Sequence, residues 1–247
     1  MSSVENLLRS VIDESTGAIK LVQVAQSLSK PGVRPIEYFE DFVEADANSR
    51  FTDTNDGGTG TNVLLDGQGG WLSVVTAAAD NDYHLMSSGT EFVRMQASKP
   101  FFFEAKIKLT EANTDDANWV IGLSDTLTTG FLANDGGGPA ASYDGAVFFK
   151  VDGTMAIQFE TSNAGTQVTN ANVAAFSSGT EYTLGISFEP GNGTTGNVIP
   201  YVNGVAGTTH AITLAGLEEM HLIFGVKAGG ANAETLSVDY LFFQGAR

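Results

Sequence analysis

Histidine, the side chain most often used for acid–base and metal chemistry, is rare and widely spaced in this chain. It has three histidines, His84, His210 and His221, and no two of them have the spacing of a shared metal site. His210 follows an Asn-Gly turn, so we expect it on a polar face, and His221 is expected at the solvent-exposed end of a strand. We therefore interpret all three histidines as structural residues.

Paired carboxylates are the second kind of catalytic group for which the sequence can be searched. Glycoside hydrolysis requires two carboxylates at a defined separation. The chain has no Glu-x-Asp-x-Glu segment, and in the nearest candidate, residues 40–44, Glu40 and Asp41 point to opposite faces of a strand. Cysteine is absent and no Gly-x-Ser-x-Gly segment occurs. The sequence therefore predicts no catalytic residue and no enzymatic activity.

Calcium is the metal that the loops of this chain could bind, because it prefers carboxylate and carbonyl oxygens. Three loop segments offer such oxygens: Asp53–Asp56, Asp80–Asp82 and Asp115–Asp116. Acidic loops are also typical of any chain with this charge, since 12 Lys and Arg stand against 29 Asp and Glu. We predict no cofactor and no metal ligands, with bound calcium as the alternative.

Aromatic residues offer a further kind of binding chemistry. Trp71, Tyr143 and Tyr201 could stack on sugar rings if they lie on an exposed surface. Tyr201 is expected on the strand face opposite to its apolar neighbours. Trp119, in contrast, shares a strand face with apolar residues and is expected in the core.

The composition narrows the classes of function. A net charge of −17 repels phosphate backbones, which argues against nucleic-acid binding. The sequence contains no run of about 18 apolar residues, so no membrane-spanning helix is predicted. The start of the chain has no basic segment followed by an apolar block, so no secretory signal is expected. A length of 247 residues suits one large all-β domain.

The segment Phe101–Leu109 gives the clearest structural signal. Its apolar side chains alternate with Glu104, Lys106 and Lys108, which predicts a strand with one buried and one exposed face. Similar short segments follow one another along the chain, so we expect an antiparallel two-sheet jelly-roll sandwich. We predict a Gly- and Asn-rich loop over Thr52–Asn62 and further strands at Val63–Leu65, Trp71–Thr76, Tyr83–Met86, Phe92–Gln96, Trp119–Leu123, Ala146–Lys150, Met155–Glu160, Tyr182–Phe188, Val198–Val202, His221–Lys227 and Leu236–Phe243.

Residues 124–143 form the longest irregular stretch of the predicted domain. They contain the run Asp135-Gly136-Gly137-Gly138-Pro139. Loops this long are uncommon unless they bind something or contact a partner. A phosphate-binding glycine loop would need a helix directly after it, and none is predicted here.

The first 36 residues differ from the remainder, so we divide the chain into an N-terminal arm and linker, 1–36, and a sandwich domain, 37–247. The arm begins with apolar residues at helical spacing and ends in a proline-containing linker, residues 30–35. Its net charge is +1, against −18 for the domain. We expect the arm to reach a neighbouring subunit, with packing onto its own domain as the alternative. The predicted partner-binding residues are Val4, Leu7, Leu8, Val11, Ile12, Ile19 and Leu21.

Three segments near the end resemble the closing strands of concanavalin A-like, laminin-G-like jelly rolls. They are Tyr182–Phe188, the Tyr-Val-Asn-Gly run at Tyr201–Gly204, and Leu236–Leu241. In that family such a hairpin joins two strands and a final strand completes the sheet. The resemblance implies the same architecture over residues 37–247.

A second resemblance is to virion structural proteins of tailed bacteriophages. It rests on Phe39–Phe42, Asp80–Asp82, Phe103–Leu109 and Trp119–Asp125 and on the cysteine-free, acidic, turn-rich composition. It implies a non-enzymatic protein that decorates or cements the capsid, made in the host cytoplasm and forming a homo-oligomer. Its partners would be the major capsid protein or other virion subunits, with no nucleic acid or membrane. The alternative is a glycan-binding, lectin-like module of the same fold.

Overall fold

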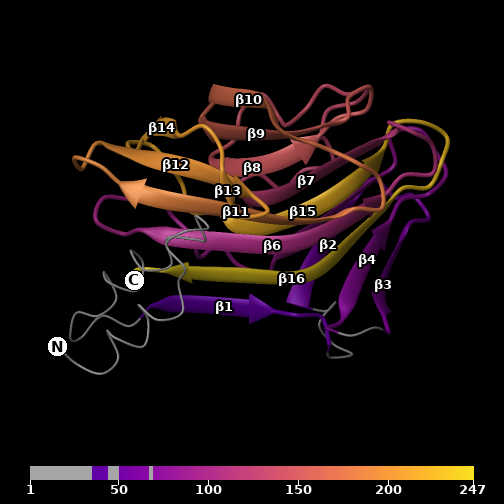
Figure 1. Ribbon diagram of the computed structural model, residues 1–247, viewed down its shortest axis with the longest axis horizontal. Coiled ribbons are helices and arrows are strands. Elements are labelled where there is room, and N and C mark those ends of the chain that lie inside the picture. Colours follow the sequence, from indigo (N-terminus) through magenta and orange to yellow (C-terminus); the bar gives the residue numbers. More distant parts are fainter. Residues whose placement is uncertain (1–34, 44–49, 67–68) are drawn as a thin grey trace.

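The computed structural model describes residues 35–43, 50–66 and 69–247, which form two antiparallel β-sheets packed face to face (Figure 1). The predicted all-β, two-sheet class is confirmed, and these residues contain no helix that could cross a membrane. One sheet has nine strands: β1 (Ile36–Glu40), β3 (Thr61–Leu65), β4 (Trp71–Val75), β6 (Phe101–Thr110), β11 (Glu181–Pro190), β12 (Thr195–Val202), β13 (Val205–Ala206), β14 (His210–Thr213) and β16 (Thr235–Gly245). The other has seven: β2 (Phe51–Asn55), β5 (Tyr83–Ser88), β7 (Ala117–Ser124), β8 (Gly145–Lys150), β9 (Ala156–Asn163), β10 (Thr166–Ala175) and β15 (His221–Ala228).

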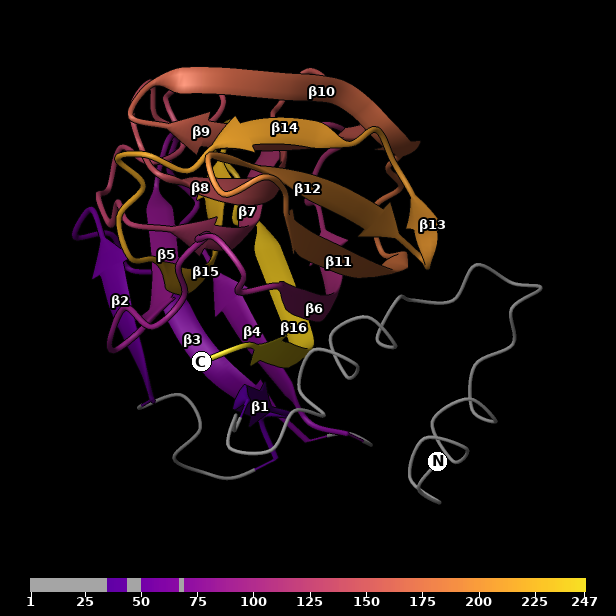
Figure 2. The ribbon, with the colours of Figure 1, turned by 90° about the vertical axis from the view of Figure 1, so that its left-hand side faces the viewer.

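The strand order brings distant segments of the chain together. The nine-stranded sheet runs β13-β12-β11-β6-β16-β4-β3, with β1 beside β16 and β14 beside β12. The seven-stranded sheet runs β10-β9-β8-β7-β15-β5-β2. Figure 2 shows β10 and β14 at one end of the molecule and β1 at the other.

Strand β6 lies in the middle of the nine-stranded sheet, as its alternating pattern predicts. Its apolar face is buried in the core between the sheets, whereas Glu104, Lys106 and Lys108 remain half-exposed. The ring of Phe101 stacks on that of Phe188 at 5.3 Å between centroids. Trp119 is fully buried in the same core, as predicted.

The central strands of the seven-stranded sheet are buried on both faces. In β8, Phe148 points into the core between the sheets, whereas Val147 and Phe149 belong to a second apolar cluster on the outer face. The long loop between β7 and β8, residues 125–144, covers that outer face with the buried side chains of Phe131 and Leu132. We call this segment the roof loop.

Two sequence predictions of local structure are corrected, and strand β10 (Thr166–Ala175) is added. The segment Phe92–Gln96 is not a strand; it makes only single bridge pairs at Val93 and Gln96. The predicted loop Thr52–Asn62 is shorter, because β2 occupies residues up to Asn55 and β3 begins at Thr61. Strand β10 was not predicted, because it is a largely polar edge strand that needs no apolar alternation.

The prediction for His210 is also corrected. It was predicted on a polar face, but only 3% of it is exposed. Its Nδ1 lies 3.1 Å from Thr161 Oγ1, and its ring packs beside Phe159. Burial lowers the pKa of His210, which favours the neutral ring. The predicted helix and residues 30–34 of the predicted linker lie outside the described residues, as do all seven predicted partner-binding residues.

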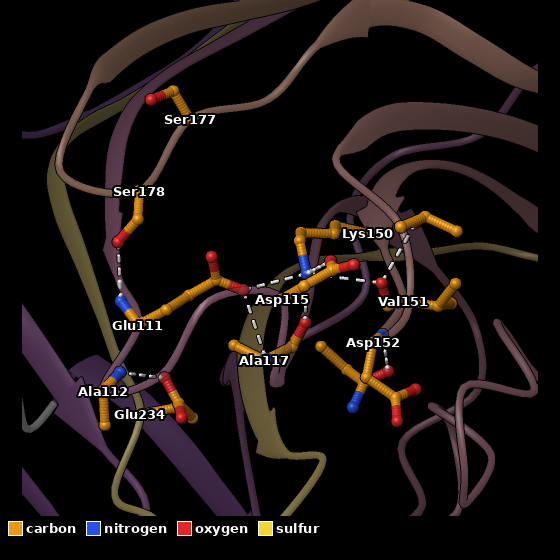
Figure 3. A network of polar contacts seen from close by, with 12 residues as sticks. Glu111, Ala112, Asp115, Ala117, Lys150, Val151, Asp152, Ser177, Ser178 and Glu234 are labelled. Atoms are coloured by element: carbon orange, nitrogen blue, oxygen red, sulfur yellow. Dashed lines mark hydrogen bonds and ion pairs between the residues drawn. The ribbon is translucent and has the colours of Figure 1, made fainter.

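A buried ion cluster closes one end of the seven-stranded sheet (Figure 3). Lys150 is fully buried, and its ammonium lies 2.9 Å from Glu111 Oε1 and 3.1 Å from Asp115 Oδ1. It also donates to the carbonyl oxygen of Ala117 at 2.9 Å. The cluster therefore connects the loop after β6 to the ends of β7 and β8.

Removing the Lys150 charge should strongly destabilise the fold. Lys150→Met leaves Glu111, whose side chain is 1% exposed, without its cation. Breaking a buried ion pair in this way typically costs about 3–5 kcal/mol. Urea unfolding measures the loss, and Lys108→Met, at a half-exposed lysine, is the matched control. Equal stability of the two variants would contradict a structural role for the cluster.

Glu234 gives a pH dependence with a defined sign. Burial raises its pKa to about 7, with Glu111 and Asp116 adding to the rise, although the amide of Ala112 donates to Oε2. Because the folded protein holds this proton more tightly than the unfolded chain, the contribution of Glu234 to stability falls as pH rises from about 4.5 through about 7. Glu234→Gln should remove about 1–3 kcal/mol of that fall. Urea unfolding across this range measures it, and parallel curves for both proteins would refute the assignment.

Candidate functional site

A polar cavity of about 270 Å³ opens where the roof loop ends over strands β8–β10. We call it the β8–β10 cavity. Glycines and a proline of the roof loop form one wall, and side chains from three neighbouring strands form the other. Its lining residues are Gly136, Gly137, Gly138, Pro139, Phe149, Val151, Gln158, Glu160, Gln167 and Thr169.

Strand register brings these side chains to one face. Phe149 of β8 lies opposite Gln158 of β9, and Glu160 of β9 lies opposite Thr169 of β10. Side chains alternate along a strand, so Gln158 and Glu160 share the outer face of the sheet. The pairing of the consecutive strands β8, β9 and β10 therefore builds the polar wall.

The glycines give the opposite wall its shape. Gly136 and Gly138 have φ values of 71° and 77°, which residues with a Cβ adopt only with strain. A Cβ on Gly136 would also lie 2.3 Å from Asp152 Oδ1. The amide of Ala133 donates to the carbonyl of Gly138 at 2.8 Å and closes the turn.

Lys227 holds the roof loop on the sheet. It is 2% exposed, and its ammonium donates to the carbonyl of Leu132 at 2.8 Å and to Asn134 Oδ1 at 2.5 Å. Burial lowers the pKa of this lysine, and nearby aspartates oppose that effect. The cavity wall is thus anchored rather than free to swing.

Glu160 is the carboxylate of the β8–β10 cavity. Its oxygens accept hydrogen bonds from Tyr143 (3.2 Å), from Gln167 (2.8 Å) and from the hydroxyl of Thr169. Burial raises its pKa, and the hydroxyl donors partly offset that rise. The carboxylate is therefore held in one orientation.

The amide of Gln158 is available to a ligand. It has no side-chain hydrogen bond to any described residue, although it lines the cavity. Gln167, in contrast, is fixed, because it donates to Glu160 and to the carbonyl of Ala140. A free amide beside a fixed amide and a fixed carboxylate is suited to binding neutral hydroxyl groups.

The cavity lacks the usual arrangement for hydrolysis. Glycosidases of the common type need two carboxyl groups about 5–9.5 Å apart. The lining of the β8–β10 cavity includes only Glu160 as a carboxylate. The geometry of this site supports binding better than bond cleavage.

The three aromatic residues predicted to stack on glycans lie in different places. Tyr143 is 2% exposed and supports the cavity from below through its bond to Glu160. Tyr201 is 7% exposed and packs on Phe102 of the nine-stranded sheet. Burial removes the faces of both tyrosine rings from solvent. Trp71 is half-exposed, with the Lys108 ammonium 5.1 Å from its ring centroid.

The predicted calcium ligands serve mainly as internal partners. Asp53 Oδ2 lies 3.1 Å from His84 Nδ1, and Asp82 Oδ2 lies 3.9 Å from His84 Nε2. Burial alone would lower the pKa of His84, but Asp53 and Asp82 outweigh it and raise the pKa. Asp115 binds Lys150. Across the described residues, no group of three or more His, Asp or Glu side chains is arranged to hold a metal ion.

The polar residues of the cavity do not stand out in the sequence. Gln158, Glu160, Gln167 and Thr169 carry no recognisable motif, and β10 was missed altogether. The available signal was the length of the roof loop, because loops this long are uncommon unless they bind something or contact a partner. Its glycines do line the cavity.

Comparison with known proteins identifies the fold. No protein-family model and no curated protein matches the sequence. A protein of unknown function from Shewanella oneidensis MR-1 matches in structure with TM-score 0.57 and 14% identity, over 100% of this chain and 95% of that one. A legume lectin-like domain from Entamoeba histolytica matches with TM-score 0.53 and 13% identity, over 84% and 95%. The fold is a lectin-like jelly roll.

Enzymes share this lectin-like jelly roll. An endo-1,3-beta-glucanase from Streptomyces sioyaensis matches with TM-score 0.58 and 13% identity, over 87% of this chain and 97% of that one. At such identities the likeness concerns the fold alone. The concanavalin A-like resemblance is confirmed as architecture, and nothing in these three likenesses indicates a virion protein.

Proposed function

We propose that the protein is a glycan-binding module and that the β8–β10 cavity is its binding site. The observation that carries the proposal is the free amide of Gln158 beside the fixed Glu160 carboxylate in an open polar cavity. The lectin-like fold is consistent with this function.

The chemistry of the cavity suits a neutral sugar. Sugar hydroxyls both donate and accept hydrogen bonds, so they can pair with a carboxylate and with amides at the same time. The glycine wall allows close approach to the backbone of the roof loop, and Phe149 supplies apolar surface. Because the roof loop and Glu160 are already held in place, little order need be gained on binding.

The virion role remains a separate prediction. It depends on residues 1–34 for contacts with capsid subunits, and these lie outside the described residues. Leu8→Asp should weaken assembly and leave the sandwich folded, because it places a charge in the predicted apolar stripe. Capsid occupancy of the variant measures this, and unchanged occupancy would contradict it.

A glycan array with and without calcium tests the proposed function, followed by calorimetric titration of the best ligand. Gln158→Ala should weaken binding about three- to tenfold, the value of one neutral hydrogen bond. Gln158→Trp should abolish binding by filling the cavity. Gln244→Ala, on β16, is the matched control and should leave affinity unchanged.

Three results would overturn the glycan-binding proposal: no ligand on the array, unchanged affinity in Gln158→Trp, or an equal loss in the Gln244→Ala control. The same ligands should be incubated with the protein and examined for cleavage. Cleavage abolished by Glu160→Gln would replace the binding function with an enzymatic one.

A further inference from the structure

A second cavity, of about 170 Å³, is lined by three basic residues: Arg94, Lys99 and Arg247. We call it the basic cavity. It lies where the beginnings of β1 and β6 meet the end of β16. Figures 1 and 2 both place β1 and the end of β16 far from β9 and β10, so this cavity is distinct from the β8–β10 cavity.

The other basic residues of the domain are occupied elsewhere. Of the 12 basic residues, four lie in residues 1–36, which leaves eight in residues 37–247. Lys150 and Lys227 are buried within the fold. Arg50 and Lys106 pair with carboxylates, and Lys108 lies over the Trp71 ring. The remaining three all line the basic cavity.

These three cations have no ion pair with a described residue. Glu219 also lines the cavity, but it lies outside ion-pair distance of all three. Like charges gathered in one cavity repel one another, and an anion would relieve that repulsion. In a chain of net charge −17, three cations in one cavity provide a local site that can attract an anion.

The floor of the basic cavity is apolar. Phe101 and Phe243 line it with ring centroids 5.5 Å apart, and Phe92 meets Phe243 edge-on. Gly245 permits this packing, because a Cβ there would lie 2.9 Å from the Phe243 ring. Gln96 adds an amide to the lining.

We propose that the basic cavity binds a uronate residue of an acidic glycan. The cationic side chains would form charge-assisted hydrogen bonds with the sugar carboxylate, and Gln96 would bind a ring hydroxyl. The phenylalanine floor would contact the apolar C–H edge of the ring. A cavity of this size is smaller than the roughly 300 Å³ of typical ligand sites, so it holds a single ring rather than a longer segment. The glycan nature of the ligand rests on the proposed function, but the site does not.

The test is calorimetric titration of the full chain with trigalacturonate, maltotriose and triglutamate at low and high salt. Trigalacturonate should bind, and more weakly at high salt because ions screen the attraction. Arg94→Gln and Lys99→Gln should each lower its affinity about tenfold or more, the value of a charge-assisted hydrogen bond. Lys108→Gln is the matched control and should change it less than about twofold, because Lys108 lies outside both cavities.

Two outcomes would overturn the basic-cavity proposal. Unchanged uronate affinity in Arg94→Gln, Lys99→Gln and their combination would show that the cavity is not the site. If triglutamate binds as tightly as trigalacturonate, the cavity recognises negative charge and not a sugar.

Failure of the proposed glycan-binding function of the β8–β10 cavity would give a different result from failure of the basic-cavity proposal. If Gln158→Trp leaves the binding of neutral glycans unchanged, the β8–β10 cavity is refuted while the basic cavity stands. If Gln158→Trp abolishes uronate binding and Arg94→Gln does not, the acidic glycan belongs to the β8–β10 cavity. That result overturns only the proposal for the basic cavity.

Discussion

The seven-stranded sheet must bury two apolar faces, and much of the remaining structure depends on how it does so. One face packs on the nine-stranded sheet, and the other would expose Val147, Phe149 and Ile223 without a cover. The roof loop supplies that cover with Phe131 and Leu132. Fully burying such side chains is worth about 1.5–3 kcal/mol each. The β8–β10 cavity lies where the cover stops, so polar side chains of β9 and β10 face open space there.

Two buried lysines stabilise this arrangement from opposite faces of the same sheet. Lys150 pairs in register with the core residue Trp119, and Lys227 pairs with Asn118 next to it. Side chains alternate, so Lys150 points toward the core and Lys227 toward the roof loop. A buried ammonium is costly without partners. Each one therefore specifies the position of the loop that carries its acceptors.

The alternation of apolar and polar residues was informative where a strand has one solvent-exposed face. Phe101–Leu109 revealed both its own strand and its buried side in this way. The same reasoning could find Ala146–Lys150 as a strand, but its outer face is apolar too and gave no sign of what covers it. One indication was missed. Strands without polar alternation stand next to a long loop that contains Phe131 and Leu132, and this combination indicates that the loop folds back over the sheet.

The cavity residues were beyond sequence reasoning for a different reason. Glu160 becomes part of a site only through Tyr143, Gln167 and Thr169, which reach it by strand pairing and by the course of the roof loop. Polar edge strands such as β10 carry little apolar pattern, so their register cannot be read in advance. The arm differs again, because its predicted contacts lie outside the described residues.

The two cavities differ in the charge that they can accept. The β8–β10 cavity presents a carboxylate with amides and suits neutral hydroxyls, whereas an anion there would meet Glu160. The basic cavity has the opposite preference. Three cations and one carboxylate, Glu219, line the basic cavity, so its lining is net positive although the protein as a whole is strongly acidic. At physiological ionic strength, exposed charges more than about 8 Å away are largely screened. A glycan carrying both neutral and acidic sugars could therefore engage the two cavities by separate parts of its chain.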